Sequence, residues 1–225
     1  MAGAGKLIVL EGPEGAGKST QLRSLERHLG EHGLPVVASR EPGGTRLGAE
    51  IRRLLLDPNG EIAARAEALL FMASRAQLVE RELRPALAAG RIVLLDRFFL
   101  STYAYQIAAR GLPEPEVRAA NGFATSGLVP DLTLVLDLDP REGMARVQAR
   151  GGHDRMESTG KAFHDRVAAA FTTYLETDWQ REHPECGPIV GIDARGQPEE
   201  VFGRIVAALA ARWPETFPRL PGSDR

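Results

Sequence analysis

Five short apolar runs recur along the chain, and longer segments of another pattern separate them. The runs are rich in Val, Ile and Leu and nearly continuous; they are Leu7–Leu10, Val36–Ala38, Ile92–Leu95, Leu132–Leu138 and Ile189–Ile192. Continuous runs of this length are typical of strands buried on both faces of a parallel sheet. The intervening segments repeat apolar residues with the period of a helix. They are Gln21–Leu29, Ile51–Leu56, Ala63–Leu87, Val117–Phe123, Ala162–Trp179 and Glu199–Trp213.

This alternation of strands and helices predicts an α/β fold in three layers, with a five-stranded parallel sheet flanked by helices. The chain has 225 residues, of which 43% are hydrophobic and 26% charged, enough for one sizeable core. We find no repeat and no linker. We therefore predict a single domain over residues 1–213, followed by a frayed tail at 214–225 that is rich in proline and polar residues.

The overall charge and the apolar runs bear on partners and location. A formal net charge of −2 gives no bulk attraction to nucleic acid or to an anionic membrane, so we expect neither as a partner. The N-terminal apolar run is too short for a signal peptide, and no run is long enough to span a membrane. Cys186 is the only cysteine, which excludes an internal disulfide. We expect a cytoplasmic protein.

The first apolar run ends in a glycine-rich loop. Residues 12–19 read GPEGAGKS, the P-loop pattern G-x-x-x-x-G-K-[ST], between a predicted strand and a predicted helix as the motif requires. Backbone N–H groups of such a loop cradle phosphates, the lysine reaches the β- and γ-phosphates, and the hydroxyl holds Mg²⁺. The candidate ATP-binding residues here are Gly12, Pro13, Glu14, Gly15, Ala16, Gly17, Lys18, Ser19 and Thr20.

A P-loop alone does not separate kinases from GTPases or other ATPases. GTPases of the Ras type read guanine through an Asn-Lys-x-Asp motif, which this sequence lacks. Two classes remain: an enzyme that passes the γ-phosphate to a small molecule, and an ATPase switch.

The third apolar run ends at Asp96 and Arg97, and the carboxyl end of a parallel strand is where such folds place their chemistry. Asp96 can orient a magnesium ion together with Ser19. Arg97 offers a planar fork that matches a second phosphate. These residues predict a metal site and an acceptor site beside the P-loop.

The segment after Arg97 carries an unusual set of polar side chains. If it is helical, Ser101 and Tyr105 share the face of Arg97, and Thr102 with Gln106 forms the neighbouring stripe. A core helix has little use for two hydroxyls, an aromatic ring and an amide in one place. We interpret the stripe as a binding surface for one small ligand.

Two further segments fit the same interpretation. Arg40 and Glu41 follow the second predicted strand, and Glu67, Phe71 and Arg75 share one helical face. Phe71 could stack on a base while Arg75 donates to a base carbonyl. We expect that face not to be fully buried, because it carries an arginine.

Six motifs together resemble those of the bacterial thymidylate kinase family of nucleoside monophosphate kinases. They are EGPEGAGKST, REPGGT, LLFMASRAQ, DRFFLSTYAYQ, PDLTLVLDL and RGGHDRME, in the family's order over about residues 6–195. The resemblance implies the reaction ATP + dTMP → ADP + dTDP with Mg²⁺, the P-loop NTPase fold with a short arginine-bearing lid at about residues 145–158, and a homodimer.

The resemblance also implies roles for the acceptor residues. Glu14 would accept a hydrogen bond from the 3′-hydroxyl of dTMP, and Tyr105 would occupy the space that a 2′-hydroxyl needs. Phe71 would stack on thymine. The remaining dTMP-binding candidates would bond its carbonyl edge, line the base or clamp the phosphate; they are Arg40, Glu41, Arg75, Arg97, Ser101, Thr102 and Gln106.

Two regions remain for ATP. In the lid, arginines fit phosphoryl transfer, whose charge spreads over the phosphate oxygens; we favour Arg150 as the catalytic residue, with Arg146 and Arg155 as further ATP contacts. Ala194 and Gln197 resemble a loop that borders adenine, although an ordinary strand-to-helix turn explains them equally well.

Other functions stay open at this point. A kinase for another nucleoside monophosphate, or for a deoxynucleoside, would use the same P-loop and a similar acceptor site. A P-loop ATPase switch would hydrolyse ATP in response to a partner and would need no small acceptor.

Overall fold

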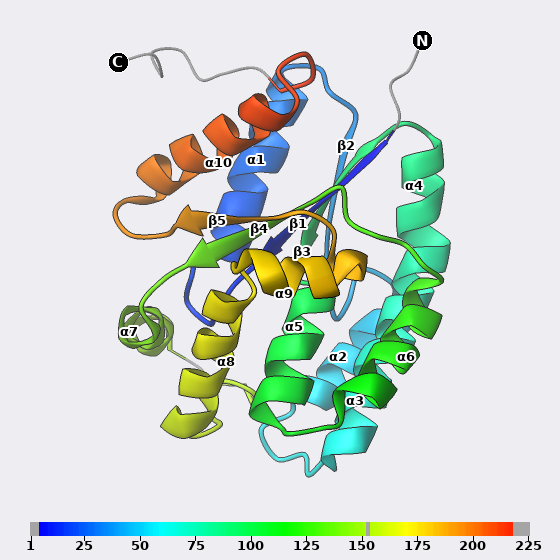
Figure 1. The fold of residues 1–225 in the computed structure, drawn as a ribbon, viewed down its shortest axis with the longest axis vertical. Helices are drawn as coiled ribbons and strands as arrows, with labels where there is room; N and C mark the ends of the chain where they lie inside the picture. Colours follow the sequence, from blue (N-terminus) through cyan, green and yellow to red (C-terminus); the bar gives the residue numbers. More distant parts are fainter. Residues whose placement is uncertain (1–4, 152–153, 218–225) are drawn as a thin grey trace.

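The computed structural model describes residues 5–151 and 154–217. Over these residues the predicted parallel sheet of five strands is present, in the order β2-β3-β1-β4-β5 (Figure 1). The strands are β1 (Lys6–Glu11), β2 (Val36–Arg40), β3 (Ile92–Asp96), β4 (Leu132–Asp137) and β5 (Ile189–Asp193). Each predicted apolar run is a strand, and the predicted fold class is confirmed.

Helices occupy the segments between the strands. They are α1 (Lys18–Glu31), α2 (Arg46–Leu56), α3 (Ala64–Leu78), α4 (Arg84–Ala88), α5 (Phe99–Thr102), α6 (Glu114–Thr125), α7 (Pro140–Arg150), α8 (Lys161–Thr173), α9 (Thr177–Glu182) and α10 (Pro198–Arg212). Short π-helical stretches continue two of them: η1 (Val79–Leu83) joins α3 to α4, and η2 (Tyr103–Ala109) extends α5. A 3₁₀ turn, η3 (Pro184–Cys186), precedes β5. The predicted helix Ala162–Trp179 is interrupted between α8 and α9.

Neighbouring residues of each strand face opposite layers, which explains the continuous apolar runs. Ile8 packs in one hydrophobic cluster with Leu25 of α1 and Ile205 of α10. Leu7 packs in the other cluster, with Phe163 of α8. Figure 1 shows α1 and α10 together on one side of the sheet, with α5 and α8 on the other. Because both faces are covered, alternation with polar residues would place polar groups in the core.

The strand register brings three chain segments to one edge of the sheet. Leu10 of β1 pairs with Asp96 of β3, and Arg40 of β2 pairs with Asp96 from the other side. The P-loop, the end of β3 and the end of β2 therefore emerge side by side, at the carboxyl ends of the strands.

The chain stays ordered beyond the predicted end of the domain. Phe217 is only 2% exposed, packs in the cluster of α1 and α10, and lies 5.5 Å from the ring of Trp213. We predicted that the tail frays from residue 214. Burial of this aromatic ring instead holds residues 214–217 against the domain. Residues 218–225 lie outside the described part.

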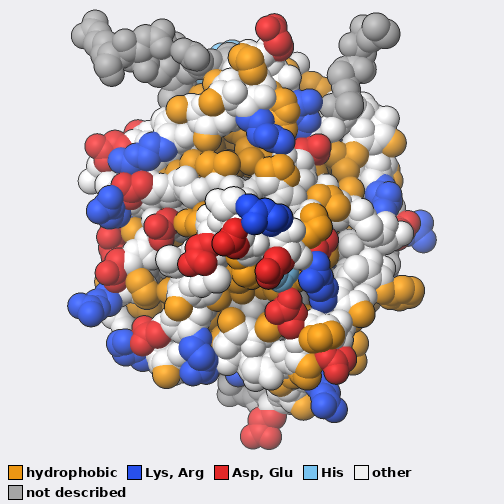
Figure 2. All heavy atoms as spheres, in the orientation of Figure 1, with side chains coloured by type: hydrophobic (Ala, Val, Ile, Leu, Met, Phe, Trp, Pro, Cys, Tyr) orange, Lys and Arg blue, Asp and Glu red, His pale blue; other side chains and the backbone are white. Residues whose placement is uncertain are grey.

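The surface shows a mixture of charges. On the face drawn in Figure 2, acidic and basic side chains are interspersed among apolar ones. In the described part of the chain, every helix is too short or too polar to cross a membrane.

Candidate active site

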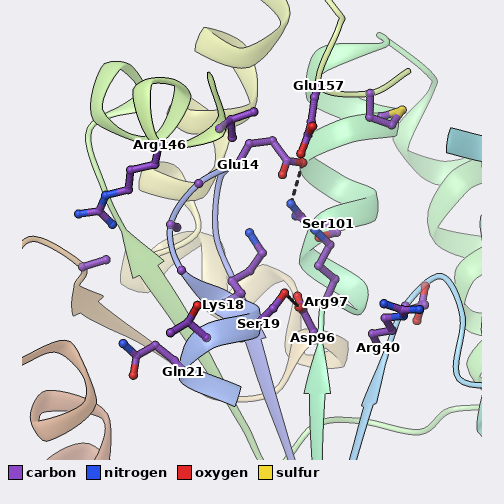
Figure 3. Close-up of a pocket in the computed structure, with 18 of the residues that line it drawn as sticks. Glu14, Lys18, Ser19, Gln21, Arg40, Asp96, Arg97, Ser101, Arg146 and Glu157 are labelled. Atoms are coloured by element: carbon purple, nitrogen blue, oxygen red, sulfur yellow. Dashed lines mark hydrogen bonds and ion pairs between the residues drawn. The ribbon is translucent and has the colours of Figure 1, made fainter. Parts of the chain in front are cut away.

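A cavity of about 930 Å³ opens at the carboxyl edge of the sheet. Figure 3 shows the P-loop crossing its middle, Arg146 and Gln21 on one side, and Arg40 on the other. Most of the predicted site residues line it: Glu14, Gly15, Ala16, Gly17, Lys18, Ser19, Thr20, Arg40, Glu41, Phe71, Arg75, Asp96, Arg97, Ser101, Thr102, Tyr105, Gln106, Arg146, Ala194 and Gln197. Its size suits one or two nucleotides.

The P-loop has the geometry that its sequence predicts. Gly15 and Gly17 adopt φ values of 73° and 93°, which side-chain-bearing residues rarely tolerate. A Cβ atom on Gly15 would lie 2.0 Å from the carbonyl oxygen of Gly143, so the loop also packs tightly against α7. The Nζ atom of Lys18 donates to the carbonyl oxygens of Gly12 and Pro13, at 2.9 and 2.7 Å. Those two residues contribute backbone groups and do not line the cavity.

Ser19 and Asp96 meet across the floor of the cavity. The Ser19 hydroxyl donates to Oδ2 of Asp96 at 2.6 Å, although the two residues lie far apart in the sequence. Two oxygen ligands at the mouth of a P-loop suit Mg²⁺, which prefers hard oxygen donors and keeps several waters. The predicted pair of metal ligands is therefore brought together.

Arg97 connects the P-loop to the acceptor helix. Its Nη2 atom donates to Oε1 of Glu14 at 2.8 Å, and its Nη1 atom to the Ser101 hydroxyl at 3.0 Å and the Gly12 carbonyl at 3.2 Å. The Tyr105 hydroxyl donates to the same Glu14 oxygen at 2.8 Å. Arg97 also has φ 70°, and strain of this kind at a non-glycine residue clusters at functional sites.

These contacts set the charges of the site. Burial would raise the pKa of Glu14, but Arg97, Lys18 and the Tyr105 hydroxyl together lower it to about 2, so the carboxylate is ionised at neutral pH. Burial and the nearby Arg97 lower the pKa of Lys18 to about 8, with Glu14 and Asp96 opposing them. Lys18 therefore carries its proton at neutral pH in most molecules and loses it as the pH rises through about 8.

Arg75 differs from the prediction. We expected its helix face to be partly open because of the arginine, but Arg75 is 1% exposed. Its charge is tolerated because Nε donates to both oxygens of Glu41, at 2.7 and 2.9 Å. Nη1 donates to Thr102 and Asn121, and Nη2 donates to Glu41 and to the Phe98 carbonyl, so every N–H of the group has an acceptor. Phe71 lines the cavity and is half-buried. Burial raises the pKa of Glu41, whereas Arg75 opposes this effect.

Sequence reasoning missed Arg52. This residue of α2 lines the cavity together with Arg40 and Arg97, and its Nη1 atom donates to the Pro42 carbonyl at 3.1 Å. Burial and the repulsion of Arg40 lower the pKa of Arg52, with Asp154 opposing them. Three guanidinium groups around one cavity are a binding site for a multiply charged anion. Arg52 is the first of two adjacent arginines in the run IRRLLL, and nothing in the sequence distinguishes it from Arg53.

Sequence reasoning also missed Glu11, the last residue of β1. It is 0% exposed and accepts hydrogen bonds from the backbone N–H groups of Phe98 and Ser101, at 2.7 and 3.0 Å, and from the Ser101 hydroxyl. Its carboxylate thus caps α5, which has no cap of its own. An acid ending an apolar run, directly before the P-loop, is the signal that could have revealed it.

The arginines predicted to lie in the lid occupy different places in the structure. Arg146 lines the cavity and pairs with Glu142 on α7. Arg155, which we expected near ATP, instead donates to the Leu55 carbonyl at 2.8 Å and to Glu67 at 2.7 Å, away from the cavity wall. The long reach from lid to α3 explains why spacing could not predict this contact. The side chain of Arg150, the predicted catalytic arginine, lies outside the described part.

The remaining end of the cavity lies between α1 and α10. Ala194 and Gln197 line it beside Pro198, whose carbonyl accepts a hydrogen bond from Nε2 of Gln21 at 2.9 Å. The structure thus brings Ala194 and Gln197 to the same cavity as the P-loop, where Pro198 and Val201 add apolar side chains.

Two half-sites therefore share one cavity: a P-loop with the candidate metal ligands Ser19 and Asp96, and an arginine cluster beside an aromatic side chain. This arrangement is that of a P-loop phosphotransferase that binds two substrates. The chain belongs to the thymidylate kinase family, whose family model, described as "Thymidylate kinase", matches residues 10–183.

Curated relatives agree with this assignment. A thymidylate kinase of Deinococcus radiodurans is 46% identical over 92% of this chain and 98% of its own length. One of Carboxydothermus hydrogenoformans is 42% identical over 91% of this chain and 97% of its own length. One of Pseudomonas putida strain GB-1 is 52% identical over 79% of this chain and 85% of its own length. The family, the phosphotransferase class and the thymidylate kinase function predicted from the sequence are confirmed.

The lowered pKa of Lys18 gives a testable prediction. At pH 8 about half of the Lys18 side chains in the free protein are neutral, and bound phosphates favour the charged form, so ATP binding takes up a proton. The affinity for ATP should therefore fall as the pH rises through about 8. Titration calorimetry at pH 8, in two buffers of different ionisation heat, measures the uptake.

The control is Lys18→Arg, because arginine stays charged throughout this range. Proton uptake should disappear in this variant wherever binding remains measurable. Equal apparent heats in both buffers for the unmodified protein would contradict the role given to Lys18.

Proposed function

We propose that this cavity transfers the γ-phosphate of ATP to dTMP, giving ADP and dTDP. The contact that best supports this proposal is the shared acceptor Glu14. This P-loop residue accepts hydrogen bonds from both Arg97 and Tyr105, so the donor loop and the acceptor helix form one polar unit. A P-loop that only hydrolysed ATP would not need a second anion site joined to it.

On the donor side, backbone N–H groups of the P-loop hold the triphosphate, and Lys18 exchanges its two carbonyl partners for phosphate oxygens. Thr20 extends the contacts towards the α-phosphate, and Ala194 and Gln197 border the adenine. Ser19 and Asp96 would hold Mg²⁺, which would neutralise phosphate charge there.

On the acceptor side, the arginine cluster receives the phosphate of dTMP. Arg97 is the central clamp, with Arg40 and Arg52 beside it. Ser101 contributes by holding the Arg97 guanidinium at 3.0 Å. Bringing two anionic phosphates together is costly without this positive charge, and the cluster reduces that repulsion.

The base and sugar fill the rest of the acceptor side. Phe71 stacks on thymine, Arg75 donates to its carbonyl edge, and Thr102 and Gln106 line that edge. Glu41 does not contact the ligand in this proposal but orients Arg75.

The sugar lies between Glu14 and Tyr105. Both hydrogen bonds described above use Oε1 of Glu14, and no described residue bonds its Oε2, which can accept from the 3′-hydroxyl. Tyr105 excludes a 2′-hydroxyl by its bulk. The protein thus contributes alignment and charge rather than covalent chemistry.

Two further properties belong to the proposal. The enzyme works in the cytoplasm, where ATP is the common phosphoryl donor, and it acts as a homodimer. For the dimer, apolar side chains stand exposed on three neighbouring helices; they are Leu47 and Leu54 of α2, Leu69 of α3 and Phe123 of α6. Because α2 packs on α3 and α3 on α6, we propose that these side chains belong to one dimer surface.

The rival functions predict different kinetics. A kinase for another monophosphate would favour a different base, and a deoxynucleoside kinase would not need the arginine cluster. An ATPase switch would release ADP without any small acceptor.

A panel assay tests the reaction. ADP release is measured with ATP, Mg²⁺ and each of dTMP, dUMP, dCMP, dAMP, dGMP and thymidine. We expect the highest kcat/KM with dTMP, no turnover with thymidine, and loss of transfer in Lys18→Ala. Arg97→Ala should raise the KM for dTMP by about tenfold or more, because it removes a charge-assisted contact to phosphate. ADP release that is indifferent to the acceptor would instead favour an ATPase switch.

The lid arginines give a second prediction. Arg150→Ala should lower kcat by about a hundredfold while changing the Kd of dTMP little, because the residue stabilises charge that develops during transfer. Arg155→Ala, whose side chain is held by Glu67, serves as the comparison and should lower kcat less. Single-turnover kinetics and dTMP titration separate the two quantities. An Arg150 variant with near-normal turnover would remove the assignment.

The dimer gives a third prediction. Phe123 is 90% exposed, so Phe123→Asp should preserve the fold but convert the dimer to a monomer in sedimentation velocity experiments. Val190→Asp is the matched control, since Val190 is also exposed but lies on β5, away from this surface. Identical sedimentation of the parent and the Phe123 variant would exclude α6 from the interface.

A further inference from the structure

Glu67 of α3 is a buried carboxylate for which the proposed reaction has no direct use. Its side chain is 0% exposed and does not line the cavity. It lies one helical turn before Phe71 on the same face of α3. Side chains from two other parts of the chain converge on it: Gln106 and Arg110 at η2, and Arg155 from the lid. A buried group with this many partners fixes their orientations.

Glu67 can act only as a hydrogen-bond acceptor towards its partners. Arg110 contacts both carboxylate oxygens, at 3.1 and 3.0 Å, and Arg155 contacts Oε2 at 2.7 Å. Two guanidinium groups thus form ion pairs with one carboxylate, and an ionised carboxylate only accepts hydrogen bonds. Gln106, whose nearest amide atom is 3.2 Å from Oε1, must therefore turn its NH₂ group towards Glu67.

This orientation decides what Gln106 offers to a ligand. With Nε2 directed at Glu67, its Oε1 atom has no hydrogen-bond partner among the described residues, and the side chain lines the cavity. One helical turn before Gln106, Thr102 also lines the cavity, and its hydroxyl accepts a hydrogen bond from Arg75 at 2.8 Å. The N–H groups of Arg75 are all bonded to protein acceptors, so the group that this wall leaves open for a ligand is the carbonyl acceptor of Gln106.

A base matches this wall when its edge carries the reverse pattern. Thymine and uracil carry an imide N–H between two carbonyl groups, and this N–H can donate to Oε1 of Gln106. Cytosine places a bare ring nitrogen where the imide N–H would be, and two acceptors would then face each other. Leaving a buried acceptor unpaired is costly, so such a site discriminates strongly.

We propose that Glu67 is a positioning residue that makes the acceptor pocket selective for pyrimidines with an imide N–H, by locking the orientation of the Gln106 amide. This inference rests on the proposed function, because it concerns the base of the nucleoside monophosphate that the pocket accepts. Glu67 acts through Gln106 and touches neither ligand.

The first test is Glu67→Gln, assayed with dTMP and dCMP. An amide at position 67 can donate or accept, so Gln106 is no longer held in one orientation. We expect the ratio of kcat/KM for dTMP over dCMP to fall by about tenfold or more. The change should appear mainly as a raised KM for dTMP, with kcat changed less, because Glu67 lies outside the cavity that holds the reacting phosphates.

A swapped double variant, Glu67→Gln with Gln106→Glu, guards against a mere loss of folding. The introduced amide can donate to the introduced carboxylate, whose second oxygen again faces the cavity as an acceptor. The net charge of the buried cluster is also unchanged. We expect this variant to recover a ratio within about threefold of the parent's. A swapped variant no more selective than the single one would overturn the proposal.

Arg110→Met is the matched control for structural damage. It removes two hydrogen bonds to Glu67 but leaves the contact of Glu67 with Gln106 and the ion pair with Arg155. We expect a lower melting temperature with the dTMP over dCMP ratio within about twofold of the parent's. A loss of selectivity equal to that of Glu67→Gln would assign the effect to general destabilisation and overturn the proposal.

Failure of this inference is distinguishable from failure of the proposed function. A parent protein that does not phosphorylate dTMP would refute the proposed function itself. A parent that prefers dTMP, with an unchanged ratio in Glu67→Gln, would refute only the role of Glu67. A parent that uses dTMP and dCMP equally well would also refute the selectivity proposed here while keeping the transfer reaction.

Discussion

The constraint on which the site depends is the junction between the ends of β1 and β3. The Glu11 carboxylate, fully buried, accepts hydrogen bonds from the backbone of Phe98 and Ser101 and so caps the helix that carries the acceptor residues. The backbone N–H of Arg97 donates to the Leu10 carbonyl at 3.0 Å, and its side chain reaches the Gly12 carbonyl. The start of the P-loop and the start of the acceptor helix cannot move apart without breaking these bonds. Phosphoryl transfer relies on alignment, and this junction sets the distance between donor and acceptor.

Around that junction, buried charges orient one another. Glu41 neutralises Arg75, Glu14 pairs with Arg97, and Glu67 pairs with two arginines. Such pairs contribute little net stability, because desolvation offsets much of the attraction. What they supply is a fixed direction for each donor and acceptor. A pocket that selects a base and a sugar by hydrogen-bond pattern needs that direction before the ligand arrives.

The sequence predicts the local features of this molecule well and its long-range pairs poorly. The strands follow from continuous apolar runs, and the P-loop follows from glycine and lysine spacing within a few residues. The acceptor stripe from Arg97 to Gln106 follows from helical periodicity. The burial of Arg75 was missed because Glu41 lies 34 residues away, and the contact of Arg155 with Glu67 spans 88 residues. No periodicity reports which charges the fold will pair.

The lid illustrates what such pairs add. Its two described arginines contact opposite halves of the site: Arg146 lines the donor side, whereas Arg155 is fixed to α3 and the end of α2 on the acceptor side. Two arginines that lie nine positions apart in the sequence thus contact different elements, because each finds its own carboxylate: Glu142 one turn away on the same helix for Arg146, and Glu67 across the fold for Arg155. Only the first of these partners could be read from helical spacing.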